Sequence, residues 1–141
     1  MSSIQEAIRV LDIEAKSILA LKERLDEGFE KAVEMICQCP GKVVVAGMGK
    51  SGHIGRKIAA TMSSTGTPAL FLHTAESSHG DLGVVTENDC LIVISYGGGS
   101  QELNDLLSFA TRKGIPLIAM TGNKDSCLLY TSPSPRDGLL S

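Results

Sequence analysis

The fold of this chain is decided by one stretch, Lys42-Val-Val-Val-Ala-Gly-Met-Gly-Lys-Ser-Gly-His-Ile-Gly55. Its first part, Val43 to Ala46, is a short apolar run without polar alternation, which is typical of a central parallel strand covered by helices on both faces. The run ends in glycines and passes directly into a helical pattern. The stretch therefore predicts a strand, a tight turn and a helix in immediate succession.

The turn after this strand favours an anion. Gly47, Gly49 and Gly52 allow backbone N–H groups to approach a ligand closely. The following helix offers its unpaired N–H groups and the positive end of its dipole. Lys50 and Ser51 add a cation and a hydroxyl group. We interpret the turn as half of a phosphate-binding site.

Two better-known phosphate motifs fit this turn less well. The three glycines match the bare dinucleotide fingerprint, but that motif also requires an acidic residue at the end of the next strand. The next predicted strand ends at His73, without a carboxylate. A Walker loop requires glycine where this chain has Val44, so that motif is excluded. A nucleotide-dependent oxidoreductase remains the least favoured hypothesis.

Length and composition indicate one ordinary globular domain. The 141 residues suffice for a single core, and 43% are hydrophobic and 21% charged. A net charge of −3 argues against nucleic-acid and membrane-surface partners, which require a basic footprint. No apolar run reaches the roughly 18 residues of a membrane helix, and the N-terminus lacks signal-peptide features. The expected location is the cytoplasm.

The four cysteines do not form a metal-binding pattern. Cys37 and Cys39 are the only close pair, and one intervening residue is too few for a zinc site. Cys90 falls inside a predicted buried strand. We interpret the cysteines as structural.

Helices and strands alternate along the chain. A first helix is predicted from a cap at Ser2 or Ser3 to an end or kink at Gly28, and a second over about 29–37. It remains open whether these two helices cover the sheet or pack against another subunit. Further elements are predicted in this order: a helix ending near Gly66, strands at 69–72 and 90–94, a helix over 101–113 and a strand at 116–120. The buried helix faces are predicted to be Ile54, Ile58, Ala59, Met62 and Ser63, and Leu103, Leu106, Leu107 and Ala110.

Three of the predicted strands end in glycine with Ser, Thr or Lys. Beside the first turn, these exits are Ser95-Tyr-Gly-Gly-Gly-Ser100 and Thr121-Gly-Asn123. In doubly wound sheets such exits share the edge where ligands bind. The sequence therefore predicts an α/β fold, with a Rossmann-like or flavodoxin-like parallel sheet and helices on both faces. Residues 127–141 have two prolines, no helical period and no strand pattern, so a domain over 1–126 is expected to end incomplete before a disordered or artefactual tail.

Three motifs together resemble one family, the sugar isomerase (SIS) domain, and specifically the arabinose 5-phosphate isomerases. They are Gly47–Lys57, Ser64–Pro68 and Ser78–Gly83, within a resemblance that covers about residues 1–126. The resemblance implies interconversion of ribulose 5-phosphate and arabinose 5-phosphate, which supplies the Kdo sugar of lipopolysaccharide or capsules. It also implies a homo-oligomer, usually a tetramer, that requires no cofactor.

Carried over to this sequence, the resemblance implies catalytic roles for Lys50 and Glu102. A proton moved between adjacent sugar carbons requires a carboxylate base and a cation near the developing enediolate oxygen. A glutamate in a first helical turn is also stabilised by the helix dipole alone. The resemblance further implies an inhibitory zinc at His73 and substrate contacts at Gly66, Thr67 and His79. The glycine-rich exits add predicted substrate contacts at Gly49, Ser51, Ser95, Gly97, Gly98 and Ser100.

The chain departs from the family in two places. The family usually has Ser-Asn-Ser-Gly-Glu-Ser at the third strand exit, whereas this chain has Ser95-Tyr-Gly-Gly-Gly-Ser100, so that a serine and a glutamate of the family pattern are both glycine here. A further catalytic Glu and His, and the paired CBS domains of many relatives, lie beyond the matched region. The alternative to an isomerase is therefore a phosphosugar-binding domain without turnover.

Overall fold

The computed structural model describes residues 2–77, 81–98, 101–122 and 139–140. Its elements are α1 (Ser3–Ala20), the 3-10 helix η1 (Leu21–Arg24), α2 (Glu27–Cys37), β1 (Val43–Gly47), α3 (Gly49–Ser64), β2 (Ala69–His73), α4 (Thr74–Ser77), the 3-10 helix η2 (Asp81–Val84), β3 (Cys90–Ile94), α5 (Gln101–Lys113), β4 (Leu117–Met120) and β5 (Leu139–Leu140). The predicted strands and the helix over 101–113 match the structure to within one residue at each end.

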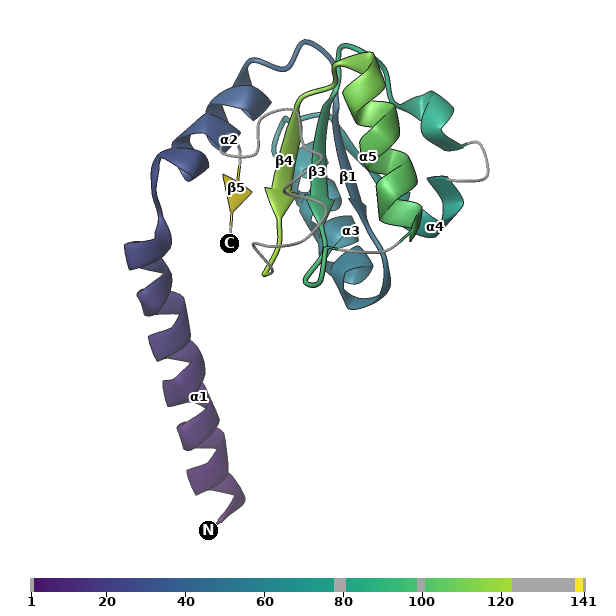
Figure 1. Cartoon of the computed structure of the whole chain (residues 1–141). Coiled ribbons are helices and arrows are strands. Elements are labelled where there is room, and N and C mark those ends of the chain that lie inside the picture. Colours follow the sequence, from purple (N-terminus) through teal and green to yellow (C-terminus); the bar gives the residue numbers. More distant parts are fainter. Residues whose placement is uncertain (1, 78–80, 99–100, 123–138, 141) are drawn as a thin grey trace.

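The strands form one parallel sheet in the order β2-β1-β3-β4-β5. Because all strands run in the same direction, their carboxyl ends meet at one edge of the sheet (Figure 1). The order reverses between β1 and β3, with β2 on one side of β1 and β3 on the other. The predicted doubly wound α/β fold is confirmed.

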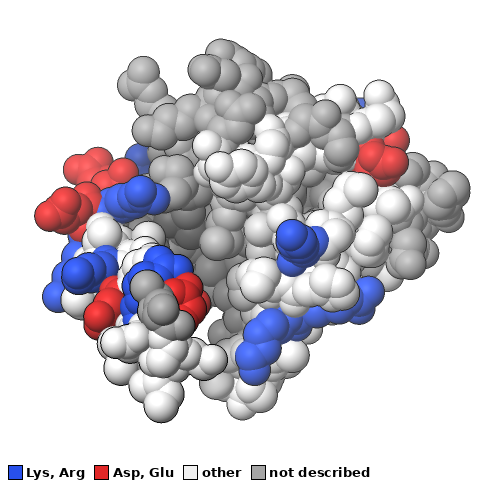
Figure 2. All heavy atoms as spheres, turned by 90° about the horizontal axis from the view of Figure 1, so that it is seen from below, with Lys and Arg blue, Asp and Glu red and all other residues white. Residues whose placement is uncertain are grey.

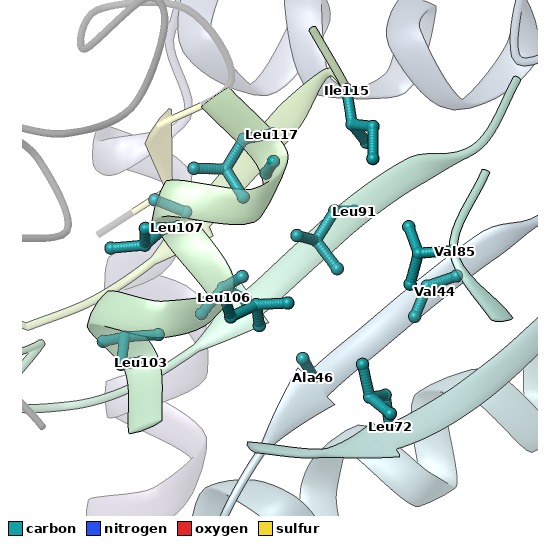
Figure 3. Close-up of a cluster of buried hydrophobic side chains, with 13 residues drawn as sticks. Val44, Ala46, Leu72, Val85, Leu91, Leu103, Leu106, Leu107, Ile115 and Leu117 are labelled. Carbon is teal, nitrogen blue, oxygen red and sulfur yellow. The ribbon is translucent and has the colours of Figure 1, made fainter. Parts of the chain in front are cut away.

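One face of the sheet is covered by α5. Figure 3 shows side chains of β1, β3 and β4 meeting those of this helix. The predicted buried face of the helix is confirmed, since Leu103, Leu106, Leu107 and Ala110 are at most 2% exposed. Burying a side chain of this size stabilises a fold by about 1.5–3 kcal/mol, so this layer is a principal source of stability.

The opposite face is covered by α2 and α3. The predicted face of α3 is partly wrong, because Ile54 is 58% exposed, Ser63 is exposed too, and small residues meet the sheet. A Cβ added at Gly55 would lie 3.0 Å from the Phe71 ring, and one at Gly52 would lie 3.4 Å from the Gly47 carbonyl oxygen. These two glycines therefore let α3 lie close to β1 and β2. Close helix packing, rather than approach to a ligand, explains Gly52.

The helix α1 does not take part in this core. Ser2 caps it through a capping box with Gln5, as predicted, but none of its residues is buried. Figure 1 shows the helix extending away from the sheet. Of the two alternatives left open by the sequence, covering the sheet holds for α2, whose Ala32 is 2% exposed, and not for α1.

Two boundaries differ from the sequence prediction. Gly28 was expected to end or kink the first helix, yet it lies inside α2, because Asp26 caps that helix by accepting a hydrogen bond from the Gly28 N–H at 2.9 Å. The tail was expected to contain no strand, but β5 pairs with β4. The end of the domain at residue 126 stays a prediction. Within the described residues, no helix is long and apolar enough to span a bilayer.

The amino-terminal edge of the sheet is closed by a buried ion pair. Asp89 is 3% exposed and accepts hydrogen bonds from the Lys42 backbone N–H at 2.9 Å, the Lys42 ammonium at 2.8 Å and the Thr86 N–H at 2.7 Å. Burial raises the pKa of Asp89, but these donors outweigh burial and hold the pKa below its ordinary value. The pair joins the start of β1 to the turn before β3.

Candidate functional site

A pocket of about 420 Å³ opens at the carboxyl edge of the sheet. It lies where the strand order reverses, which is the usual position of ligands in doubly wound folds. Its walls are the exits of β1, β2 and β3 and the starts of α3 and α5, through Gly47, Met48, Ser51, Thr74, Ile94, Ser95, Gly97, Gly98 and Leu103.

The first wall is the turn from β1 into α3. A side chain at Gly47 would be tightly packed, since a Cβ would lie 3.2 Å from the carbonyl oxygens of Ile94 and Ser51. Gly49 has a φ of 60°, a conformation that other residues rarely adopt. Met48 precedes the helix and makes no side-chain cap hydrogen bond, and Ser51 lies half-buried in the pocket wall. The start of α3 thus presents a hydroxyl group and helical N–H groups toward the pocket.

The second wall is the exit of β3. The Ser95 hydroxyl oxygen accepts a hydrogen bond from the Gly98 N–H at 2.9 Å, so its own hydrogen is not used by that bond. The Ser95 N–H donates to the Met120 carbonyl at 3.0 Å, which continues the pairing with β4. Gly98 has a φ of 69°, which closes the turn. The two predicted strand exits, with Ser51, Ser95, Gly97 and Gly98, are therefore brought together.

The two residues with predicted catalytic roles are adjacent in sequence to residues that line this pocket. Lys50 is exposed and directly precedes Ser51, and Glu102 is half-buried and directly precedes Leu103. Both occupy first helical turns, of α3 and α5.

The charge around this edge is uneven. The helix α3 carries Lys50, Arg56 and Lys57 and no acidic residue, although the whole chain has a net charge of −3. Figure 2 views the molecule from below and, in its lower right part, shows basic side chains with no acidic side chain of a described residue beside them. This arrangement favours an anionic ligand.

Other predicted residues are not brought to this pocket. Gly66 and Thr67 lie between α3 and β2, at the amino-terminal edge, where they line a separate pocket of about 190 Å³. Their substrate contacts stay a prediction. His79 and Ser100 lie outside the described residues.

His73 does not by itself provide a zinc site. Its Nδ1 accepts a hydrogen bond from the Ala75 N–H at 3.2 Å, so only Nε2 remains as a donor to a metal. No group of three or more His, Cys, Asp or Glu side chains suited to a metal occurs among the residues that the structure describes. The inhibitory zinc at His73 stays a prediction.

Sequence reasoning missed Thr74, which is 2% exposed and lines the pocket. It directly follows β2. The rule that parallel strands end at one edge applies to β2 as well, so it would have identified this position had we not required glycine at an exit. Met48, Ile94 and Leu103 also line the pocket, and their apolar side chains gave no functional signal.

The fold and the pocket define a class of protein, a doubly wound α/β domain with a pocket at the switch point of its sheet. The SIS domain family model matches residues 35–130. The chain belongs to the SIS domain family.

Its relatives include named isomerases. It is 47% identical to the arabinose 5-phosphate isomerase KdsD of Pseudomonas aeruginosa over 125 residues, and 50% identical to the arabinose 5-phosphate isomerase GutQ of Escherichia coli K12 over 120 residues. The aligned parts cover 89% and 85% of this chain, but only 38% and 37% of those relatives. The chain thus spans well under half the length of the curated relatives it matches.

A solved structure supports the same family. The protein c3406 of E. coli CFT073, solved in complex with arabinose 5-phosphate, superimposes with a TM-score of 0.81 at 33% identity. The superposition covers 100% of this chain and 77% of that one.

Proposed function

We propose that this chain binds a pentose 5-phosphate and contributes to the interconversion of ribulose 5-phosphate and arabinose 5-phosphate. The observation that carries the proposal is the pocket at the switch point, where two glycine- and serine-rich strand exits meet two helix starts. The names of the relatives with 47% and 50% identity supply the substrate class.

The phosphate group would occupy the part of the pocket between Ser51 and Ser95. At neutral pH the oxygens of a phosphate group mainly accept hydrogen bonds. The group therefore needs hydrogen-bond donors, and these two hydroxyl groups supply them. The positive ends of α3 and α5 add a favourable field. Ser100, from the same exit as Ser95, is proposed as a further donor.

The proton transfer would use Glu102 as the base and Lys50 as the cation near the developing enediolate oxygen. A carboxylate can take the proton from one carbon and return it to its neighbour. A cation placed where negative charge develops stabilises the transition state more than the ground state. Both side chains directly precede a residue of the pocket wall in a first helical turn, which supports these roles.

Phosphate binding is tested by calorimetry with arabinose 5-phosphate. Ser51→Ala removes one hydrogen bond to a charged group, so affinity should fall by about 1.5–3 kcal/mol. Ser64→Ala is the matched control, because Ser64 lies at the other end of α3 and its hydroxyl donates to the Thr61 carbonyl. Equal affinity of the Ser51 variant and the control would place the phosphate elsewhere.

Turnover is tested with ribulose 5-phosphate as substrate. Glu102→Gln should reduce the rate by about 10²–10⁴ with little change in affinity, because the amide cannot accept the proton. Asp105→Asn removes the same charge one turn further along α5 and should leave the rate unchanged. A Glu102→Gln rate equal to that of the control would contradict the role of Glu102. Sugar-phosphate binding without any turnover in the parent chain would select the binding-domain alternative.

We also propose that the chain self-associates through α1 and acts in the cytoplasm. Ile4, Ile8, Leu11 and Ile18 follow one another at spacings of four, three and seven residues and are 53–73% exposed. Such spacing is typical of a seam between paired helices, and the partner we propose is a second copy of this chain. Leu11→Glu should then lower the mass measured by analytical ultracentrifugation, whereas an unchanged mass would contradict the interface.

A further inference from the structure

The exit of β3 is tied to the exit of β4 by the backbone of Tyr96. Its carbonyl oxygen accepts a hydrogen bond from the Gly122 N–H at 3.2 Å and another from the Thr121 hydroxyl at 3.3 Å. Both donors directly follow β4. The residue between Ser95 and Gly97, two residues of the pocket wall, is therefore held by the neighbouring strand exit.

The side chain of Tyr96 strengthens this connection. A Cβ added at Gly122 would lie 2.6 Å from Cε2 and 2.8 Å from Cδ2 of the ring, so the ring lies directly against the Gly122 backbone. Gly122 is not among the glycines with positive φ. A side chain at position 122 would therefore have to displace the exposed Tyr96 ring.

The ring is not there to fill the core. Tyr96 is 83% exposed, the most exposed large hydrophobic residue of the described chain. An aromatic ring in water at a strand exit gains little from burial, so its close approach to Gly122 contributes little to the core.

The backbone beside the ring would otherwise be loose. Gly97 and Gly98 follow Tyr96, and glycine loses more conformational freedom on ordering than any other residue. A ligand that has to order such a loop binds more weakly by the cost of the ordering. Holding the loop before the ligand arrives removes part of that cost.

We propose that Tyr96 and Gly122 form a clamp that positions the β3 exit for phosphate binding. The clamp makes Tyr96 a positioning residue, which acts through the backbone of Ser95, Gly97 and Gly98. The inference rests on the proposed function, because it takes the ligand of this pocket to be a phosphate.

The test is a double-mutant cycle, with affinity for arabinose 5-phosphate measured by calorimetry. Gly122→Ala pushes the ring away and Tyr96→Ala removes it, so each should weaken binding by about three- to tenfold. The double variant should bind no more weakly than Tyr96→Ala, because without the ring the added methyl group displaces nothing. Tyr96→Phe keeps the ring and the carbonyl group and should bind like the parent.

A second readout needs no ligand. Hydrogen exchange of the segment 95–98 should be faster in Gly122→Ala and in Tyr96→Ala than in the parent. In Tyr96→Phe, which keeps the ring, the exchange rate should equal that of the parent. A residue that only stabilises the fold would lower the melting temperature and leave the affinity of the folded protein unchanged.

The outcomes separate the two proposals. If the parent binds no arabinose 5-phosphate, the proposed function fails and the clamp fails with it. If the parent binds but the single variants bind equally well, or if the two substitutions weaken binding additively, the clamp alone is refuted.

Discussion

Asp89→Asn should destabilise the fold without touching the pocket. The carboxylate is 3% exposed and accepts three hydrogen bonds, two of them at the oxygen that faces the Lys42 ammonium and the Thr86 N–H. An amide of the same shape keeps one acceptor, so in either orientation its NH₂ group faces at least one of the three donors. The substitution therefore removes a charge and sets donors against each other.

The size of the effect follows from these contacts. A hydrogen bond to a charged group contributes about 1.5–3 kcal/mol, and breaking a fully buried ion pair costs about 3–5 kcal/mol. The Lys42 side chain is 28% exposed, so water can solvate its ammonium group once the pair is broken. We therefore expect a loss of about 2–4 kcal/mol, a large share of the roughly 5–15 kcal/mol of a typical domain.

The pH dependence has a definite sign. The pKa of Asp89 is lower in the folded chain than its ordinary value, because the bonds from Lys42 and Thr86 outweigh the effect of burial. Its contribution to stability is therefore complete above the unfolded pKa of about 3.9 and is lost as the pH falls through the folded pKa. The difference in stability between the parent and Asp89→Asn should be constant near pH 7 and shrink below about pH 4.

The assay is urea unfolding followed by circular dichroism at several pH values. Glu87→Gln is the matched control, since it removes the same charge from an exposed position two residues away. A free energy of unfolding for Asp89→Asn within about 0.5 kcal/mol of that control at pH 7 would refute the reasoning.

Two further predictions concern the face of the sheet that α2 and α3 cover. Burial, with smaller contributions from Cys39 and Asp89, raises the pKa of the Cys90 thiol to about 12. Iodoacetamide at pH 8 should therefore label exposed Cys37 in the folded chain and Cys90 only in urea, as measured by peptide mass spectrometry. Labelling of both cysteines at one rate would contradict this prediction. Gly55→Val should lower the free energy of unfolding by about 1–3 kcal/mol, because a Cβ at position 55 would meet the Phe71 ring and Val45. The control Ala60→Val, on the exposed side of α3, should lower it by only a few tenths of a kcal/mol. Equal losses would show that the close approach at Gly55 is unimportant.

The sheet was predictable because its strands are short apolar runs that end in glycine. Such runs fix strand positions, and alternation with helices fixes a parallel sheet. The face of α3 was less predictable. Apolar spacing favoured Ile54, but the sheet is met by Gly52 and Gly55, and hydrophobic periodicity assigns no weight to residues without side chains.

The site was predictable to the extent that it lies on strand exits. The carboxyl ends of parallel strands meet, so Ser51 and Ser95 were expected together although 44 residues separate them. The contact of Tyr96 with Gly122 depends on the rotamer of one exposed ring, which no sequence pattern determines. The position of Gly66 and Thr67 at the other edge follows from the same rule, because both residues precede the predicted strand at 69–72.

The two edges of the sheet divide stability from binding. Among the described residues, the buried polar side chains are Asp89 at the amino-terminal edge and Thr74 and Thr121 at the carboxyl edge, so the one buried charge lies far along the strands from the pocket. A charge buried at the pocket would need a permanent partner, and that partner would compete with an anionic ligand. Uncharged hydroxyl groups and backbone N–H groups impose no such competition. Asp89→Asn should therefore change the free energy of unfolding and spare phosphate affinity, whereas Gly122→Ala should do the reverse. If both substitutions change both quantities to the same extent, the two edges are coupled and this division is wrong.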